Sequence, residues 1–417
     1  MSRPGLRALV AATVGAGVVL SPVLGAPPAM ADDCTSGSTG YVTSASSALT
    51  SLGVPASWNL ATGKGVKVAV VDSGVDPSNP HLKGAVVAGG SFVPGTPSDG
   101  REDAFGHGTA IAGIIAARPI SSPKSGLVGV AHDATILPVR VFYADKNPSD
   151  PDAQVPNPPD ALRTAEGIRY AVQHGAQVIN VSISVPPENV DVPVLRSAVD
   201  LALRKNVVVV ASAGNSDDGS YVSQKRFPAA FAGVIGVSAT NATGAVDNYS
   251  VHGPQVTVAA PGADVLLTPR GPGDCNSGTT PYTSWATAFV SGLAAQLRER
   301  FPRESVAQIA YRIEASADRP RLGERDDITG WGVIQPYDAL TMTFDPDRPG
   351  PRLPGGAAPR LREASSSTVQ RVGVATDPLA PARRASLWWT LGAVGLGALA
   401  LVMRPLAGRA RARRRRA

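Results

Sequence analysis

A chain of 417 residues is long enough for two or three average domains, yet only 17% of its residues are charged and 5% are aromatic. Its 44 glycines and 37 prolines are typical of small-residue packing, many turns and some unstructured stretches. The net charge of +6 does not indicate a nucleic-acid-binding surface, because seven arginines after Met403 supply it and the remainder is close to neutral.

Residues 1–31 have the features of a secretory signal peptide. Two arginines precede an uncharged, largely apolar run from Ala8 to Leu20, and an A-x-A cleavage site ends at Ala31. An N-terminal membrane anchor is the alternative, but it needs a longer apolar run than this one. We therefore expect export by the general secretion route and a mature chain that begins with a Ser/Thr-rich extension, residues 32–61.

Residues 62–343 alternate between short β-branched runs and helical patterns. The helical patterns cover Asp160 to His174 and Val194 to Arg204. This alternation predicts an α/β fold in which helices cover both faces of a mostly parallel sheet, with catalytic groups at the carboxyl ends of its strands. The runs expected as buried strands are VKVAVV (66–71), ATILPVRVF (134–142), AQVINVSIS (176–184), NVVVVASA (206–213) and GVIGVSA (233–239).

Four polar residues stand at expected strand ends or helix starts. Asp72 ends the first strand run, where a buried carboxylate needs a partner, and His107 opens the small-residue pattern FGHGTAIAGIIAA. Asn215 follows another buried strand, where its amide could donate to an oxyanion, and Ser284 opens a long helical pattern. Taken singly, each has an ordinary structural interpretation as a turn, cap or packing residue.

Together, in the order Asp, His, Asn, Ser, these segments resemble the subtilases. GKGVKVAVVDSGVDPSNPHL, GHGTAIAG, ASAGN and TSWATAFVSG correspond to the family's four blocks, and GWGVIQPYDAL (330–340) resembles its closing segment. The resemblance covers roughly residues 50 to 342 and implies a subtilisin-like three-layer fold. It implies an Asp72–His107–Ser284 triad with Asn215 in the oxyanion hole, a mechanism that needs no cofactor or metal. Family members often bind structural calcium, but the sequence has no dense acidic loop that would require it. The resemblance further implies a substrate cleft bordered by Ser182, Ile183, Ser184 and Gly214.

Two positions depart from the family pattern. Many subtilases have Gly before the Thr-Ser of the nucleophile block, where this chain has Tyr282, and many have Pro four residues after the nucleophile, where it has Ala288. Alanine is harmless at an early helix position. Tyr282 would matter if the backbone needed a positive φ there, or if its ring crowded the cleft.

The C-terminal part has the pattern of a tethered membrane anchor. Residues 344–384 form a Pro-rich linker, residues 385–403 contain no charge and are long enough to span a bilayer, and residues 404–417 form a basic tail. A buried core helix is the alternative for the apolar segment. The arginine bias predicts one transmembrane helix with a cytoplasmic C-terminus and an extracytoplasmic catalytic domain.

The complete arrangement resembles the mycosins, subtilases associated with type VII secretion. It implies a membrane-anchored serine endopeptidase that acts on protein or peptide substrates and works beside secretion-machinery membrane proteins. The alternative is a structural or assembly component of such a machine, in which proteolysis is secondary. Nucleic acid is not an expected partner.

Both cysteines lie in the part of the chain expected to be outside the cytoplasm. In an oxidising compartment two such thiols are more often bridged than free. We therefore expect a Cys34–Cys275 disulfide that joins the extension to the loop before Ser284, with two unrelated free thiols as the alternative.

Overall fold

The computed structural model describes residues 40–95, 98–143, 159–187, 191–216, 219, 221–319 and 323–355. These residues all belong to one compact unit, residues 1–359. The expected signal peptide, transmembrane helix and basic tail lie outside the described residues, as does most of the expected linker. Within the described part of the chain, no helix is long and apolar enough to cross a membrane.

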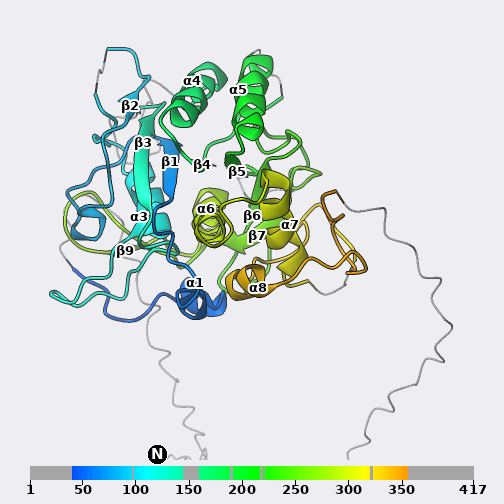
Figure 1. Cartoon of the computed structure of the whole chain (residues 1–417). Coiled ribbons are helices and arrows are strands. Elements are labelled where there is room, and N and C mark those ends of the chain that lie inside the picture. The colour runs from blue at the N-terminus through cyan, green and yellow to red at the C-terminus, as the bar shows by residue number, and fades with distance from the viewer. Residues whose placement is uncertain are drawn as a thin grey trace, which may run out of the picture. The chain divides into compact units, whose positions relative to one another are not determined.

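The centre of the unit is a seven-stranded, all-parallel sheet with the strand order β2-β3-β1-β4-β5-β6-β7 (Figure 1). A parallel sheet needs crossover connections, and α-helices supply three of the six here. The strands are β1 (Lys67–Asp72), β2 (Gly90–Ser91), β3 (Thr135–Arg140), β4 (Val178–Val181), β5 (Val208–Ser212), β6 (Ile235–Thr240) and β7 (Val258–Pro261). A separate antiparallel pair joins β8 (Leu266–Leu267) to β9 (Cys275–Asn276).

Two helical layers cover the sheet, one on each face (Figure 1). Alternate residues of β1 show why: Val68 and Val70 pack into the core of one face, while Ala69 and Val71 pack into the core of the other. The first face carries α3 (His107–Ala116), α6 (Thr283–Arg300), α7 (Val306–Ser316) and α8 (Pro336–Thr341). The second face carries α4 (Ala161–Gln173) and α5 (Val192–Arg204).

The predicted α/β class and mostly parallel sheet are confirmed. All five predicted strands form, and so do both predicted helices, α4 and α5. Two edge strands, β2 and β7, were not predicted from the sequence. β2 has only two residues and β7 ends in Pro261, so neither forms a long β-branched run.

The described part of the extension packs onto the first face of the unit. It forms two short helices, α1 (Ser47–Ser51) and α2 (Val54–Ser57). The fully buried Gln296 of α6 donates to Ser57 Oγ, Ala61 O and Val130 O at 2.9–3.0 Å. The extension is therefore held by buried hydrogen bonds to the long helix, besides its own apolar contacts.

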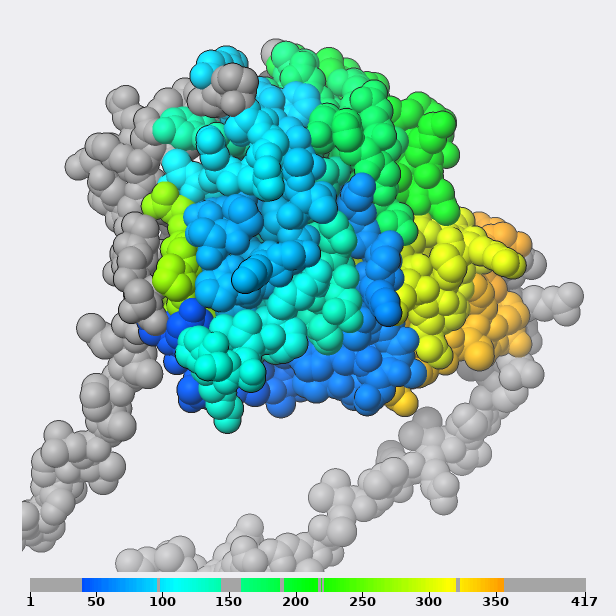
Figure 2. All heavy atoms as spheres, turned by 60° about the vertical axis from the view of Figure 1, so that its left-hand side comes forward, coloured from blue at the N-terminus to red at the C-terminus, as the bar shows by residue number. Residues whose placement is uncertain are grey.

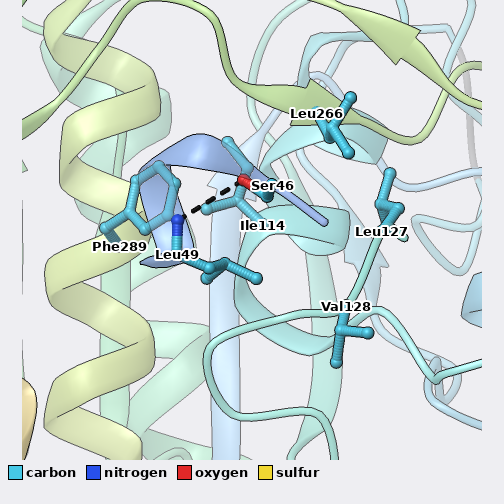
Figure 3. A pocket seen from close by; sticks show the side chains of 7 residues that line it. All are labelled: Ser46, Leu49, Ile114, Leu127, Val128, Leu266 and Phe289. Atoms are coloured by element: carbon cyan, nitrogen blue, oxygen red, sulfur yellow. Dashed lines mark hydrogen bonds between the residues drawn. The ribbon is translucent and has the colours of Figure 1, made fainter. Parts of the chain in front are cut away.

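A small apolar pocket lies beneath α1 (Figure 3). Leu49 of α1 faces Phe289 of α6 and Ile114 of α3 across it, and Ser46 caps α1 by accepting a hydrogen bond from Leu49 N at 3.4 Å. The same helix therefore covers the place where α3 and α6, the helices that carry His107 and Ser284, come together.

The first described residues pair with the loop before β9. Asp274 N–H donates to Gly40 O at 2.8 Å, and Asp274 Oδ2 accepts from Val42 N at 3.0 Å. On this face of the molecule the dark-blue start of the described chain lies beside the yellow-green segment around residue 274 (Figure 2). The extension is thus joined to a loop more than 200 residues further along the chain.

Candidate functional site

Asp72 and His107 form a hydrogen-bonded pair at the carboxyl end of β1. Asp72 is fully buried, and its Oδ1 lies 2.8 Å from His107 Nδ1. The Ser73 N–H donates to the same oxygen at 2.8 Å. Because a carboxylate oxygen only accepts, Nδ1 carries the proton and the neutral ring presents Nε2 as its free acceptor. The carboxylate therefore selects the tautomer in which Nε2 can act as a base.

The start of α3 is held in place by Asp103. One oxygen of this buried carboxylate accepts from Gly106 N at 2.8 Å, and the other accepts from Thr109 N and Oγ1 at 2.9 and 2.6 Å. These bonds satisfy backbone donors that the first turn of a helix leaves unpaired. His107 therefore sits on a capped, fixed turn.

Gly108 lets α3 approach β1 closely enough for this pair to form. A Cβ at this position would lie 2.0 Å from Gly74 O and 3.2 Å from Asp72 Cβ. The Gly108 N–H also donates to Ser73 Oγ at 3.0 Å. Any larger residue here would push His107 away from the carboxylate.

Opposing effects act on the two titratable side chains of this turn. Burial raises the pKa of Asp103, although hydrogen bonds from Thr109 and Gly106 lower it in part. Burial alone would lower the pKa of His107, but the charge and hydrogen bond of Asp72 outweigh it, and the pKa lies above its usual value. The imidazolium form is thus stabilised, as a base that must accept a proton requires.

Ser284 lies in the first turn of α6, 5% exposed. Its carbonyl oxygen accepts from Ser182 Oγ at 3.0 Å. The ring of the next residue, Trp285, lies 4.9 Å from the ring of His107, so the first turns of α3 and α6 are neighbours. Among the described residues no hydrogen bond joins the Ser284 hydroxyl to His107; such contacts are often long before substrate binds.

Asn215 is oriented by the start of α6. Its Oδ1 accepts from Thr283 N at 3.0 Å and from Thr283 Oγ1 at 2.8 Å. A backbone N–H can only donate, so the atom facing it is the amide oxygen, and the amide Nδ2 is left as a donor beside Ser284. That is the orientation an oxyanion donor needs.

The four residues expected to border the substrate cleft follow β4 and β5. Ser182 and Ile183 are buried, with the Ser182 hydroxyl engaged by Ser284 O and by Asn180 Nδ2 at 2.8 Å. A Cβ on Gly214, where φ is +100°, would lie 3.3 Å from Ser184 Oγ, so these two residues adjoin. The two segments end side by side next to Asn215, and their contact with substrate stays a prediction.

Tyr282 is accommodated without backbone strain. It precedes α6 with φ −81° and ψ 129°, an extended conformation that any residue can adopt. Its ring packs edge-on against Tyr249 at 5.3 Å and near Trp285 at 6.3 Å. Ala288, the other departure, is fully buried in the core of the first face.

Three residues of this region were not predicted from the sequence. Asp103 precedes His107 by four residues in an otherwise irregular segment, and Trp285 directly follows Ser284. Arg226 approaches Gly214, with its Cγ 2.8 Å from a Cβ built on that glycine. Only Asp103 left a recognisable signal, an acidic residue just before a helix start.

No group of three or more His, Cys, Asp and Glu side chains that could hold a metal ion is found in the described ranges. The expected Cys34–Cys275 bridge cannot be followed because Cys34 lies outside them. Cys275 is 1% exposed, and none of the described cysteines is free.

Comparison with known proteins agrees with this geometry. Residues 63–332 match the Subtilase family. Mycosin-1 of Mycobacterium tuberculosis is 37% identical over 391 residues, covering 84% of this chain and 83% of that protein. Thermitase of Thermoactinomyces vulgaris is 36% identical over 268 residues, covering 64% of this chain and 85% of that protein.

Solved structures give the same result. The crystal structure of MycP1 from the ESX-1 type VII secretion system is 29% identical and superposes with a TM-score of 0.65, covering 77% of this chain and 92% of that one. The residues that match the family, 63–332, include the starts of α3 and α6 and every strand of the main sheet. The chain therefore belongs to the subtilase family and is a subtilisin-like serine protease.

Proposed function

We propose that this protein is a membrane-anchored, extracytoplasmic serine endopeptidase of the mycosin type, linked to type VII secretion. The observation that carries the catalytic part is the 2.8 Å bond between Asp72 and His107, formed where α3 meets the start of α6. Similarity to Mycosin-1 and to MycP1 of a type VII secretion system supports the link to secretion.

The proposed reaction is acyl transfer in two steps. His107 Nε2 takes the Ser284 Oγ proton as that oxygen attacks the scissile carbonyl carbon, and then delivers it to the leaving amine nitrogen. A water molecule, activated by the same nitrogen, hydrolyses the resulting ester and regenerates the serine. Asn215 Nδ2 and the Ser284 N–H hold the oxyanion that forms in each step, while Asp72 stabilises the imidazolium.

A fluorophosphonate probe tests the nucleophile directly. We expect covalent labelling of the wild type and none of Ser284→Ala. Ser197→Ala is the matched control, because Ser197 is an exposed serine on α5, across the sheet from the site. Failure of the folded wild type to react would favour the assembly role, in which proteolysis is secondary.

The acid limb of the pH–activity profile should lie above the ordinary histidine value of about 6.5. Only neutral His107 can accept the serine proton, and its pKa is raised, so kcat/KM should fall as the pH drops through that raised value. Folding stability has the opposite pH dependence, because protonated His107 stabilises the folded protein. This stabilisation is complete below the pKa of His107 in the unfolded chain and is lost as the pH rises through its pKa in the folded protein. An acid limb below 6.5 would contradict this assignment.

Replacing Asn215 should reduce kcat by about 10²–10³, with a smaller change in KM, because its amide acts on charge that develops after substrate binds. Asn215→Leu loses both the donor and the contacts to Thr283. Asn215→Asp keeps the acceptor that Thr283 uses, loses the donor and places a negative charge beside the oxyanion. Steady-state kinetics of both variants should show the loss, and near-normal kcat in Asn215→Asp would rule out the oxyanion role.

The membrane part of the proposal rests on the sequence pattern of residues 385–403. A chain truncated after Arg384 should be released into the medium, whereas the full chain should stay with membranes after carbonate extraction. Recovery of the full chain in the soluble fraction would refute the anchor.

The Cys34–Cys275 disulfide also belongs to this proposal. Gly40 and Val42 bond to Asp274, the residue before Cys275, which brings the extension to that loop six residues after Cys34. Closing so long a loop would stabilise the fold by about 5 kcal/mol at most. Intact-mass analysis with alkylation before and after reduction tests it, and two alkylated cysteines in the unreduced protein would exclude the bridge.

A further inference from the structure

Arg226 lies against the two segments that follow β4 and β5. Its neighbour Phe227 exchanges two backbone hydrogen bonds with Val185, at 2.8 and 2.9 Å, in an antiparallel bridge that joins the segment of Arg226 to the one after β4. A Cβ on Gly214 would lie 2.8 Å from Arg226 Cγ and 3.4 Å from its Cδ. The arginine stem therefore lies flat on the backbone of Gly214, the residue before Asn215.

The Arg226 guanidinium has no partner among the described residues. Its Nε is buried without a hydrogen bond, and no carboxylate in the described part of the chain forms an ion pair with it. Arg163 and Arg312 show the contrast: Arg163 is paired with Asp160, and Arg312 forms two bonds to Glu304. A half-buried cation with an unsatisfied donor is costly, and an incoming anion would relieve that cost.

The position of this cation relative to Asn215 identifies the substrate residue it would meet. The scissile carbonyl must lie between Ser284 Oγ, which attacks it, and Asn215 Nδ2, which holds its oxygen. The side chain of the residue that carries this carbonyl begins one carbon away. Gly214 and Asn215 have Cα atoms about 3.8 Å apart, so an arginine whose stem lies on Gly214 is within reach of that side chain.

We propose that Arg226 is a specificity-determining residue that selects an acidic side chain, Asp or Glu, immediately before the scissile bond. This inference rests on the peptidase activity proposed above and names the class of substrate for it. The carboxylate would accept from the guanidinium, which presents paired N–H donors suited to a carboxylate. Because Gly214 has no side chain, the stem of Arg226 can lie against its Cα.

Peptides that differ only in Glu or Gln before the scissile bond test this preference. A charge-assisted hydrogen bond in place of an unpaired cation should favour Glu by roughly ten- to a hundredfold in kcat/KM. Arg226→Gln should bring the Glu:Gln ratio to about one, and Arg226→Glu should favour a Lys peptide over a Gln peptide. Lys225→Gln removes the same charge from an exposed neighbouring residue and should keep the wild-type ratio.

The outcomes separate this inference from the proposed function. A wild-type ratio near or below one, in protein that reacts with the fluorophosphonate probe, would overturn the role of Arg226 and leave the protease assignment intact. So would a Glu preference that persists in Arg226→Gln. Folded protein that neither cleaves any peptide nor reacts with the probe would overturn both.

Discussion

Ser284→Ala will lose peptide hydrolysis almost completely while the domain stays folded. In subtilisin, removal of the nucleophile lowers kcat by about 2 × 10⁶, and a comparable loss is expected here because the nucleophile and base act as one unit. The substitution removes a hydroxyl that makes no hydrogen bond within the described residues. The structural contact of Ser284 is made by its carbonyl, which accepts from Ser182 and is unchanged by the substitution.

Steady-state kinetics on a chromogenic peptide and thermal unfolding of the same preparations measure the two parts of this prediction. Ser197→Ala should match the wild type in both. Substantial proteolysis by purified Ser284→Ala would disprove the nucleophile assignment. Loss of activity accompanied by unfolding would instead show that Ser284 has a structural role.

His81→Leu should destabilise the domain by about 3–5 kcal/mol, because it leaves a buried charge without its partner. His81 and Asp274 are both fully buried, with His81 Nε2 3.1 Å from Asp274 Oδ1. His81 Nδ1 lies 2.6 Å from Arg118 O, and a carbonyl can only accept. Both ring nitrogens therefore lie near oxygens, although Nε2 and Asp274 Oδ1 are not aligned as a hydrogen bond.

Asp274 makes this pair important for the N-terminal extension. Its second oxygen accepts from Val42 N at 3.0 Å and from Ser125 Oγ at 2.6 Å. An unpaired Asp274 would be driven toward water, and these contacts would be lost with it. We therefore expect the extension to become more accessible to added protease in His81→Leu than in the wild type.

A second variant isolates the charge. His81→Leu combined with Asp274→Asn removes both charges but keeps an acceptor oxygen for Val42 and Ser125, so it should recover a large part of the lost stability. Urea unfolding of the wild type, the single variant and the double variant measures this. A single variant as stable as the wild type would show that the pair is not a charged one.

Local sequence patterns were sufficient to predict the central strands, the main helices and the catalytic candidates. The runs around Val68 and Val210 formed buried strands because β-branched residues suit a sheet covered on both faces. Asp72, Asn215 and Ser284 were recognised because each stands beside an apolar run within a motif. Such signals lie within a dozen neighbouring residues and can be read without knowing which segments meet.

The hydrogen bond between Asp72 and His107 depends on tertiary packing as well as on local sequence, since it needs α3 to approach β1 at Gly108. The orientation of Asn215 depends on Thr283, which lies 68 residues away. Two further contacts depend on which loops converge after folding. They are the contact of His81 with Asp274 and the contact of Arg226 with Gly214.

The sequence by itself therefore determined the strand and helix pattern, the family and the candidate triad, because these are encoded by local composition and spacing. The tertiary structure alone decided the tautomer of His107, the free donor of Asn215 and the unpaired charge of Arg226. Each of these depends on what an atom faces after distant segments pack together. Hydrogen bonding and desolvation act over a few ångströms in space, and the number of residues between two segments does not tell whether they come that close.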